Sequence, residues 1–185
     1  MLRVNELFSG IGSQTNALTR AGVDHKVVGI SEIDKLAIQS YTAMYGDTYN
    51  YGDISQIDAL KKADLWTYSF PCTDISNAGK MLGISWDTRS GLLLQVGRLL
   101  NESLKREELP MYLMMENVSM LTSRKFMYDF DRWIKYLYEL GYDTKWKLIN
   151  ASTQGIPQNR VRLIAVSKLR AGGGYVISNS HRIEA

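Results

Sequence analysis

The residues of this chain best suited to covalent chemistry are a lone cysteine and a glutamate, each at the end of a predicted strand. Cys72 is the single cysteine among 185 residues and follows Pro71, and Glu116 follows a second apolar segment. A free thiol with a pKa of about 8.5 is only a few per cent ionised near neutral pH, yet it is a strong nucleophile. The pair suggests nucleophilic catalysis assisted by an acid. The ordinary alternatives are an inert buried thiol and a glutamate at a helix N-terminus.

A second set of residues has the pattern of a cofactor site. Gly10 and Gly12 follow the first predicted strand, Glu32 follows the second and Asp53 follows the third. Glycines let the backbone approach a ligand closely, and an acid after the second strand can accept hydrogen bonds from ribose hydroxyls. Thr15 stands where a dinucleotide fingerprint requires a third small residue, which argues against a nicotinamide cofactor.

Strands and helices are expected to alternate along the chain. The predicted strands cover residues 2–8, 26–30, 49–51, 64–69, 111–115, 145–150 and 161–167, and residues 73–90 form a long loop. Apolar steps of three and four predict helices that carry Ala37, Tyr41 and Met44, then Leu93, Val96, Leu100 and Leu104, then Phe126, Phe130, Trp133, Leu137 and Leu140. The expected fold is α/β and Rossmann-like, a mostly parallel sheet with helices on both faces, whose carboxyl edge would gather the chemistry.

Seven segments, in this order, match the motifs of a known family. They are Glu6-Leu7-Phe8-Ser9-Gly10-Ile11-Gly12, Ser31-Glu32-Ile33-Asp34-Lys35, Gly52-Asp53-Ile54, Ser69-Phe70-Pro71-Cys72, Arg89-Ser90-Gly91-Leu92-Leu93, Met115-Glu116-Asn117-Val118 and Gln154-Gly155-Ile156-Pro157-Gln158-Asn159-Arg160-Val161-Arg162. On these segments the chain resembles the DNA (cytosine-5) methyltransferases over about residues 2–168. Any one motif would be noise, but seven in sequence are highly specific.

The resemblance implies a fold that binds S-adenosylmethionine, with the cofactor touching residues of the first five motifs. Glu32 would hold the ribose hydroxyls, Ile33 would pack on adenine, and Asp53 would accept from the adenine amino group. The remaining contacts implied for the cofactor are Phe8, Ser9, Gly10, Ile11, Gly12, Ile54, Pro71 and Leu93.

The resemblance also implies a covalent mechanism on a cytosine flipped out of double-stranded DNA. Cys72 would attack ring carbon 6, Glu116 would hydrogen-bond ring nitrogen 3, and Arg162 would bind the carbonyl at position 2. Arg160 would steady the Glu116–Arg162 pair. Taken singly, the two arginines read as a solvated strand face. The implied setting is DNA methylation in a restriction–modification system.

The chain departs from the family pattern after the double arginine. A target recognition domain and the last two motifs, one of which completes the cofactor pocket, have no counterpart in residues 171–185. We therefore expect a catalytic and cofactor-binding domain over residues 1–170, truncated at its C-terminal end, and a tail over 171–185. The leading hypothesis is the catalytic subunit of a split enzyme, with a second polypeptide supplying target recognition and the rest of the pocket. The alternatives are a non-catalytic binder of S-adenosylmethionine or of a protein, an RNA cytosine-5 methyltransferase and, more distantly, a nicotinamide oxidoreductase.

Composition sets the remaining expectations. The chain is 45 % hydrophobic, enough for a single well-buried domain without cross-links. The net charge of +3 permits a nucleic-acid partner without demanding one. Two histidines and one cysteine do not suggest a metal centre, so no metal is expected. No apolar run approaches the ~20 residues of a membrane span, and no signal peptide is evident, so we expect the cytoplasm.

Overall fold

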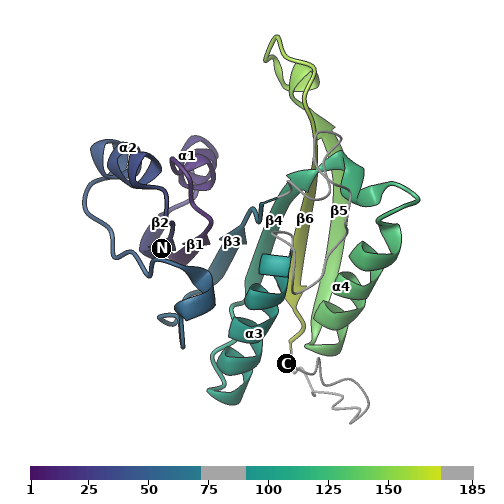
Figure 1. The fold of residues 1–185 in the computed structure, drawn as a ribbon, viewed down its shortest axis with the longest axis horizontal. Coiled ribbons are helices and arrows are strands. Elements are labelled where there is room, and N and C mark those ends of the chain that lie inside the picture. Colours follow the sequence, from purple (N-terminus) through teal and green to yellow (C-terminus); the bar gives the residue numbers. More distant parts are fainter. Residues whose placement is uncertain (72–90, 172–185) are drawn as a thin grey trace.

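A single six-stranded sheet organises the molecule. The computed structural model describes residues 1–71 and 91–171, so Cys72, the loop predicted at 73–90 and the tail from residue 172 lie outside the described residues. Figure 1 shows the strands side by side in the order β2-β1-β3-β4-β6-β5. The strands are β1 (Leu2–Leu7), β2 (His25–Ser31), β3 (Leu65–Tyr68), β4 (Tyr112–Val118), β5 (Tyr142–Asn150) and β6 (Val161–Leu169). The helices are α1 (Ser13–Arg20), α2 (Lys35–Tyr45), α3 (Leu92–Lys105) and α4 (Met127–Glu139), with short 3-10 turns η1 (Ile54–Gln56), η3 (Ser119–Thr122) and η4 (Ala151–Gln154).

The sheet is mostly parallel, as predicted. Strands β2, β1, β3 and β4 run parallel, whereas β6 is antiparallel to both β4 and β5. The strand predicted over residues 49–51 is wrong, because only one bridge forms there, between Ile30 and Asn50. The Asn50 side chain instead accepts from the backbone amides of Glu32 and Gly52, which turns the chain away from the sheet.

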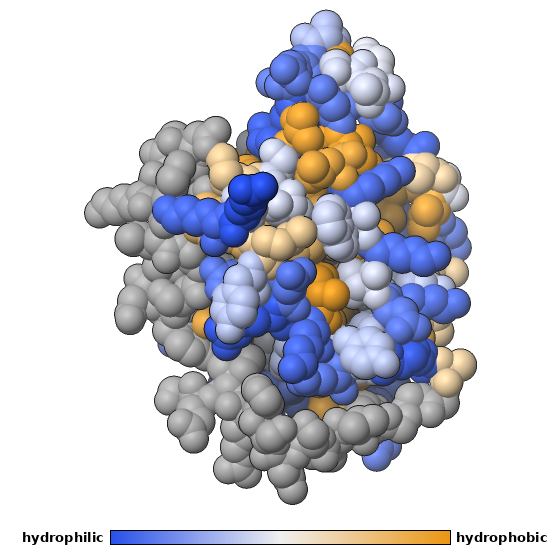
Figure 2. All heavy atoms as spheres, turned by 90° about the vertical axis from the view of Figure 1, so that its right-hand side faces the viewer, coloured by the Kyte–Doolittle hydropathy of each residue, from blue (hydrophilic) through white to orange (hydrophobic). Residues whose placement is uncertain are grey.

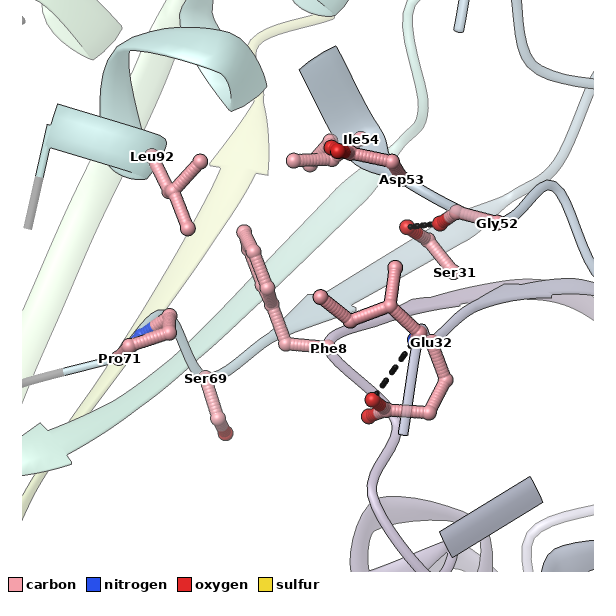
Figure 3. Close-up of a pocket in the computed structure, with 10 residues that line it drawn as sticks. Phe8, Ser31, Glu32, Gly52, Asp53, Ile54, Ser69, Pro71 and Leu92 are labelled. Carbon is pink, nitrogen blue, oxygen red and sulfur yellow. Dashed lines mark hydrogen bonds between the residues drawn. The ribbon is translucent and has the colours of Figure 1, made fainter. Parts of the chain in front are cut away.

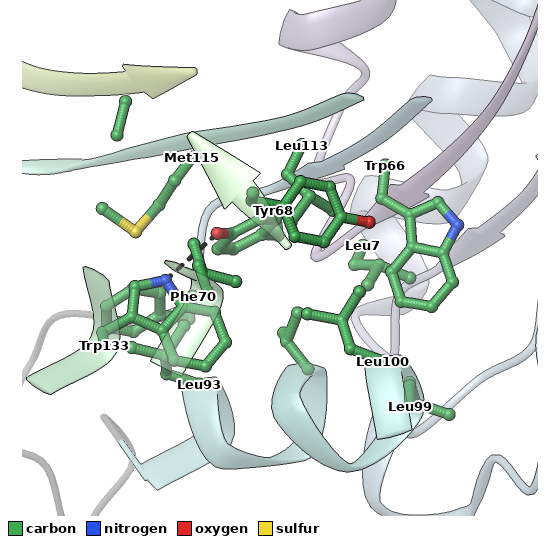
Figure 4. Packing of buried hydrophobic residues seen from close by; sticks show 14 of the residues in the cluster. Leu7, Trp66, Tyr68, Phe70, Leu93, Leu99, Leu100, Leu113, Met115 and Trp133 are labelled. Carbon is green, nitrogen blue, oxygen red and sulfur yellow. Dashed lines mark hydrogen bonds between the residues drawn. The ribbon is translucent and has the colours of Figure 1, made fainter. Parts of the chain in front are cut away.

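One face of the sheet carries the main core beneath α3 and α4 (Figure 4). Trp133 Nε1 donates to the hydroxyl of Tyr68 at 3.2 Å, and burial raises the pKa of that phenol. The two apolar stripes predicted for these helices are confirmed as buried, except that Leu104 at the end of its stripe is only half-buried. The packing of α3 and α4 against this face of the sheet holds the ends of the strands in place.

Helices α1 and α2 cover the opposite face over β1. The predicted stripe of α2 is partly wrong, since Tyr41 is buried but Met44, near the end of the helix, is 53 % exposed. On the same face of β4 and β6, Met114 and Ile164 are half-buried and Val166 is 45 % exposed, and none of the three belongs to the main core or packs against it. We call these three residues the open face. Within residues 1–71 and 91–171, every helix is too short or too polar to cross a membrane.

Candidate functional site

The turn after β1 has an unusual backbone that aims one aromatic ring. Phe8 adopts φ 57°, a left-handed conformation that costs energy in any residue with a side chain, and Gly10 and Gly12 follow at φ 53° and 86°. Figure 3 shows the Phe8 ring projecting into a pocket at the carboxyl edge of the sheet. A Cβ at Gly12 would collide with the ring of Tyr45, whose hydroxyl donates to the Gly12 carbonyl. The turn therefore needs glycine at that position and presents Phe8 to a ligand.

The pocket has a volume of about 250 Å³ and combines apolar walls with two carboxylates. Its lining residues are Phe8, Ser31, Glu32, Ile33, Gly52, Asp53, Ile54, Ser69, Pro71 and Leu92. These come from the ends of β1, β2 and β3, from the segment around η1 and from the start of α3 (Figure 3). An aromatic ring, branched aliphatic side chains and two acceptors match the needs of an adenosine-like group.

Glu32 ties the glycine turn to the start of α2. Its Oε2 accepts from the backbone amide of Gly10 at 2.8 Å, and its Oε1 accepts from the amides of Ile33 and Asp34 at 2.8 and 2.9 Å. Oε1 thus accepts two hydrogen bonds, whereas Oε2 accepts one and can accept a further one. The side chain is thus held at the pocket with acceptor capacity remaining for hydroxyl groups.

Asp53 is held as the N-cap of η1. Its Oδ1 accepts from the amide and hydroxyl of Ser55 at 2.9 and 2.8 Å. This leaves the second carboxylate oxygen for an outside donor, and Ile54 beside it is 3 % exposed. The cap gives a rigid acceptor at the pocket wall.

Several predicted cofactor residues lie elsewhere. Leu93 is 1 % exposed and belongs to the core, whereas its neighbour Leu92 lines the pocket, because Leu93 is on the inward side of α3. Ser9 is buried beneath the turn, and Ile11 is 53 % exposed; neither they nor the two glycines are among the lining residues. Their contact with a cofactor stays a prediction.

The predicted acid and one predicted arginine lie together. Arg162 Nε lies 3.0 Å from Glu116 Oε1, and both side chains keep about a quarter to a third of their exposure. Strand pairing explains the contact, because Arg162 pairs with Val118 and Ile164 pairs with Glu116 on the same sheet face. Arg160 is exposed, and its backbone bonds to Asn150 and Ala151, so the structure does not bring it into this pair.

Two hydrogen bonds that the sequence did not reveal hold the approach to Cys72. Asn117 Nδ2 donates to the carbonyl of Phe70 at 3.1 Å, which ties the chain after β3 to the end of β4. Gln14 Nε2, in the first turn of α1, donates to Ser69 Oγ at 2.5 Å. Asn117 is buried, and a polar residue on the inward side of a strand was its one available signal.

A buried carboxylate lies under the glycine turn. Glu6 Oε2 accepts from Thr15 Oγ1 at 2.5 Å and from the Tyr41 hydroxyl at 3.1 Å, which joins β1 to α1 and α2. Burial raises the pKa of Glu6 above its ordinary value of 4.5, and the hydrogen bonds from Thr15 and Tyr41 act in the opposite direction. Burial beside this carboxyl group also raises the pKa of Tyr41.

This sheet order, with a pocket of aromatic and acidic residues at the carboxyl edge, defines a Rossmann-like fold of the S-adenosylmethionine-dependent methyltransferase class. The family model for C-5 cytosine-specific DNA methylase matches residues 2–174, and the chain belongs to that family.

The comparisons with individual proteins agree. The chain is 34 % identical over 240 residues to the type II methyltransferase M2.ScrFI of Lactococcus lactis subsp. cremoris, covering 99 % of this chain and 65 % of that protein. It is 37 % identical over 169 residues to the orphan methyltransferase M.Rho11sI of Bacillus phage rho11s, covering 89 % of this chain and 32 % of that protein. The chain thus spans less than two thirds of these relatives. The S. pombe Dnmt2 methyltransferase structure superposes with a TM-score of 0.73 at 26 % identity, covering 97 % of this chain and 52 % of that one.

The Glu6 cluster predicts a pH-dependent stability. Because the folded-state pKa of Glu6 is raised, its contribution to stability is fully present below pH 4.5 and is lost as the pH rises through the raised value. The Tyr41 hydroxyl opposes that loss by stabilising the ionised form. Tyr41→Phe should therefore lower the free energy of unfolding by about 1–3 kcal/mol at pH 8 and by less at pH 4.

Urea denaturation across this pH range measures the effect. Tyr45→Phe is the matched control, since the hydroxyl of Tyr45 donates to the uncharged carbonyl of Gly12 and its loss should cost the same at both ends of the range. Equal pH dependence in the two variants would contradict the role assigned to Glu6.

Proposed function

We propose that this chain is the catalytic part of a DNA cytosine-5 methyltransferase that uses S-adenosylmethionine and acts through Cys72. The observation that carries the proposal is the Glu116–Arg162 pair, which lies at the same sheet edge as the pocket. Between them runs the segment Ser69–Pro71, anchored by Asn117 and leading directly to Cys72. A pure binding module has no chemical need for the acid–arginine pair. The proposed substrate is double-stranded DNA, and the proposed setting is cytoplasmic.

The pocket residues fit the cofactor by their donor and acceptor chemistry. Glu32 would accept from the ribose hydroxyls and Asp53 from the adenine amino group, while Phe8 and Ile33 would enclose the ring. When bound, S-adenosylmethionine supplies an electrophilic methyl group. Leu92 and Pro71 would close the side of the pocket that faces the reacting base.

The target cytosine must leave the duplex, because its ring faces are stacked inside it. The Cys72 thiolate would then form a bond to ring carbon 6. Glu116 would hydrogen-bond ring nitrogen 3, and Arg162 would bind the carbonyl oxygen at position 2, where negative charge develops. The Arg162 Nε contact holds the carboxyl group of Glu116 in place for this task.

The addition makes ring carbon 5 nucleophilic. Once that carbon carries the methyl group, transfer of its proton to water and departure of the Cys72 sulfur as thiolate would restore the aromatic ring. The contacts of Glu116 and Arg162 strengthen as charge accumulates, so they favour the transition state over the bound base.

We also propose that a second polypeptide completes the enzyme. The open face supports this, because apolar residues on a sheet are normally covered by packed elements, and Met114, Ile164 and Val166 stay partly exposed outside the main core of the described residues. The partner would cover the open face, complete the pocket and read the DNA sequence.

Cofactor binding tests the pocket. Asp53→Ala should weaken binding of S-adenosylmethionine by about 1–3 kcal/mol, because a buried amino group loses its acceptor. Asp34→Ala is the matched control: Asp34 also caps a helix, accepting from the amides of Leu36 and Ala37, but it does not line the pocket. Isothermal titration calorimetry should find the control unchanged. No heat from the unaltered chain at millimolar cofactor would refute the site.

Covalent trapping tests the mechanism. Duplex DNA with 5-fluorocytosine at the target should form a denaturation-resistant adduct with the chain in a mixture that supports methylation, because fluorine does not leave as the proton does. Cys72→Ala should abolish the adduct and methyl transfer while keeping cofactor affinity. Glu116→Gln should slow transfer by about 10²–10⁴-fold, whereas Glu139→Gln on α4 should not. Methylation by Cys72→Ala would exclude the mechanism.

The partner hypothesis predicts that the purified 185-residue chain shows little site-specific transfer of tritiated methyl groups, and that the product of a neighbouring reading frame restores it. Val166→Lys on the open face should block that restoration because it places a charge in an apolar interface. Tyr128→Lys, at a 72 % exposed position on α4, is the control. Strong site-specific transfer by the homogeneous chain alone would overturn the hypothesis.

A further inference from the structure

Arg98, in the middle of α3, binds the backbone of a segment that is distant in the chain. Its Nη1 donates to the carbonyl of Ile57 at 2.8 Å and its Nη2 to the carbonyl of Ile54 at 3.0 Å, across 41 and 44 positions. Its Nε donates to Gln95 Oε1 at 2.7 Å on the same helix. All three acceptors are uncharged. The half-buried guanidinium therefore holds the distant segment and is not engaged with a carboxylate of the described residues.

The segment that Arg98 holds is η1, which is too short to fix its own position. Backbone bonds run from the amide of Gln56 to the carbonyl of Asp53 at 3.0 Å and from the amide of Ile57 to the carbonyl of Ile54 at 3.4 Å, which is long. The last carbonyls of a helical turn lack partners inside that turn. Arg98 supplies the missing donors, and the side chains of Ile54 and Ile57 are buried in the main core. The position of η1 is therefore set from α3.

Helix α3 is a firm base for this contact. Its apolar side is buried in the main core, and the Tyr136 hydroxyl on α4 donates to the carbonyl of Gly97, the residue before Arg98, at 2.8 Å. The Tyr136 ring also stacks on Trp133, whose Nε1 donates to Tyr68 of β3. The outward surface of α4 is mostly hydrophilic (Figure 2), so its apolar side is the one that meets the core. Arg98 thus projects from a backbone that both the core and α4 hold.

The contact joins two walls of the pocket. Leu92 lines one wall at the start of α3, and Asp53 lines another as the N-cap of η1 (Figure 3). Arg98 is not a lining residue, yet it ties the helix of the first wall to the turn of the second. Oδ1 of Asp53 is bonded to Ser55 within the turn, so the direction of Oδ2 follows the position of η1. Because hydrogen bonds weaken steeply as their geometry is lost, a displaced η1 would aim this acceptor poorly.

We propose that Arg98 is a positioning residue for the recognition of adenine, acting through the carboxylate of Asp53; the inference rests on the proposed function. The planar guanidinium binds the carbonyls of Ile54 and Ile57 at the same time, which the point charge of a lysine does not do. Arg98 therefore contributes to selectivity for the adenine amino group without touching the cofactor.

The experiment compares two ligands of the full chain by isothermal titration calorimetry. One is S-adenosylhomocysteine, and the other is its analogue in which hydrogen replaces the adenine amino group. Arg98→Met should weaken binding of the first roughly tenfold and leave binding of the second unchanged, because the second has no donor for Asp53. In an Asp53→Ala background, Arg98→Met should have no further effect. Arg106→Met is the matched control, since Arg106 also lies next to α3 and donates to a distant carbonyl, that of Leu60, but does not contact η1.

Two milder variants and a ligand-free measurement keep the test decisive if Arg98→Met folds poorly. Arg98→Lys should show an intermediate loss, because it keeps the charge and one contact. Gln95→Ala removes only the acceptor of Nε and should show a smaller loss with the same dependence on the amino group. Without ligand, hydrogen exchange at the amides of Gln56 and Ile57 should be faster in the Arg98 variants and unchanged in Arg106→Met.

The outcomes separate the inference from the proposed function. Absence of S-adenosylhomocysteine binding by the unaltered chain would contradict the proposed function, and the adenine role of Arg98 would fall with it. Binding by the unaltered chain that stays the same in every Arg98 and Gln95 variant would contradict the role of Arg98 alone. Equal losses for the two ligands, or a further loss in the Asp53→Ala background, would show that Arg98 shapes the pocket without serving adenine recognition. Unchanged hydrogen exchange would overturn the inference even without a ligand.

Discussion

The hydrogen-bonded, buried carboxyl group of Glu6 is the interaction on which the pocket side of the molecule depends. An ionised or protonated acid inside a protein must have its hydrogen bonds satisfied, and Glu6 obtains them from Thr15 on α1 and Tyr41 on α2. Those contacts fix both helices against β1, and with them the turn that carries Gly12. The left-handed conformation of Phe8 is tolerated because this frame determines the path of the chain on either side. The shape of the pocket therefore depends on the buried hydrogen bonds of Glu6 beneath it.

Much of the fold was predictable because hydrophobic spacing reports burial directly. The predicted stripe from Phe126 to Leu140 is buried, and so is the stripe that starts at Leu93 except for its last residue, Leu104. Most of the strands alternate with helices, as a parallel sheet requires. The errors arose where polar side chains overrode local preference. The Asn50 side chain accepts hydrogen bonds from two backbone amides, so residues 49–51 do not extend the sheet beyond β2. Apolar periodicity carries no signal for this contact or for the reversed direction of β6.

The site was predictable to the extent that strand ends gather in a parallel sheet. That rule, with the family motifs, brought Glu32, Asp53 and the Glu116–Arg162 pair to one edge. It could not resolve which of two adjacent leucines faces the pocket, because a helix turns by about 100° per residue and its exact phase is set by packing. Nor could it find the contact of Asn117 with the Phe70 carbonyl, which joins residues 47 positions apart.

The position of β6 in the sheet has a consequence for the order in which the parts of the fold can form. It is the last described strand along the chain, yet it lies between β4 and β5, and among the described strands β5 pairs with β6 alone. During synthesis β5 must therefore wait without a sheet partner until β6 has left the ribosome. The half that holds the pocket uses only strands made before β5 and can form earlier, whereas Arg162 reaches Glu116 only when β6 inserts. A nascent chain is thus able to form the pocket before Arg162 and Glu116 meet.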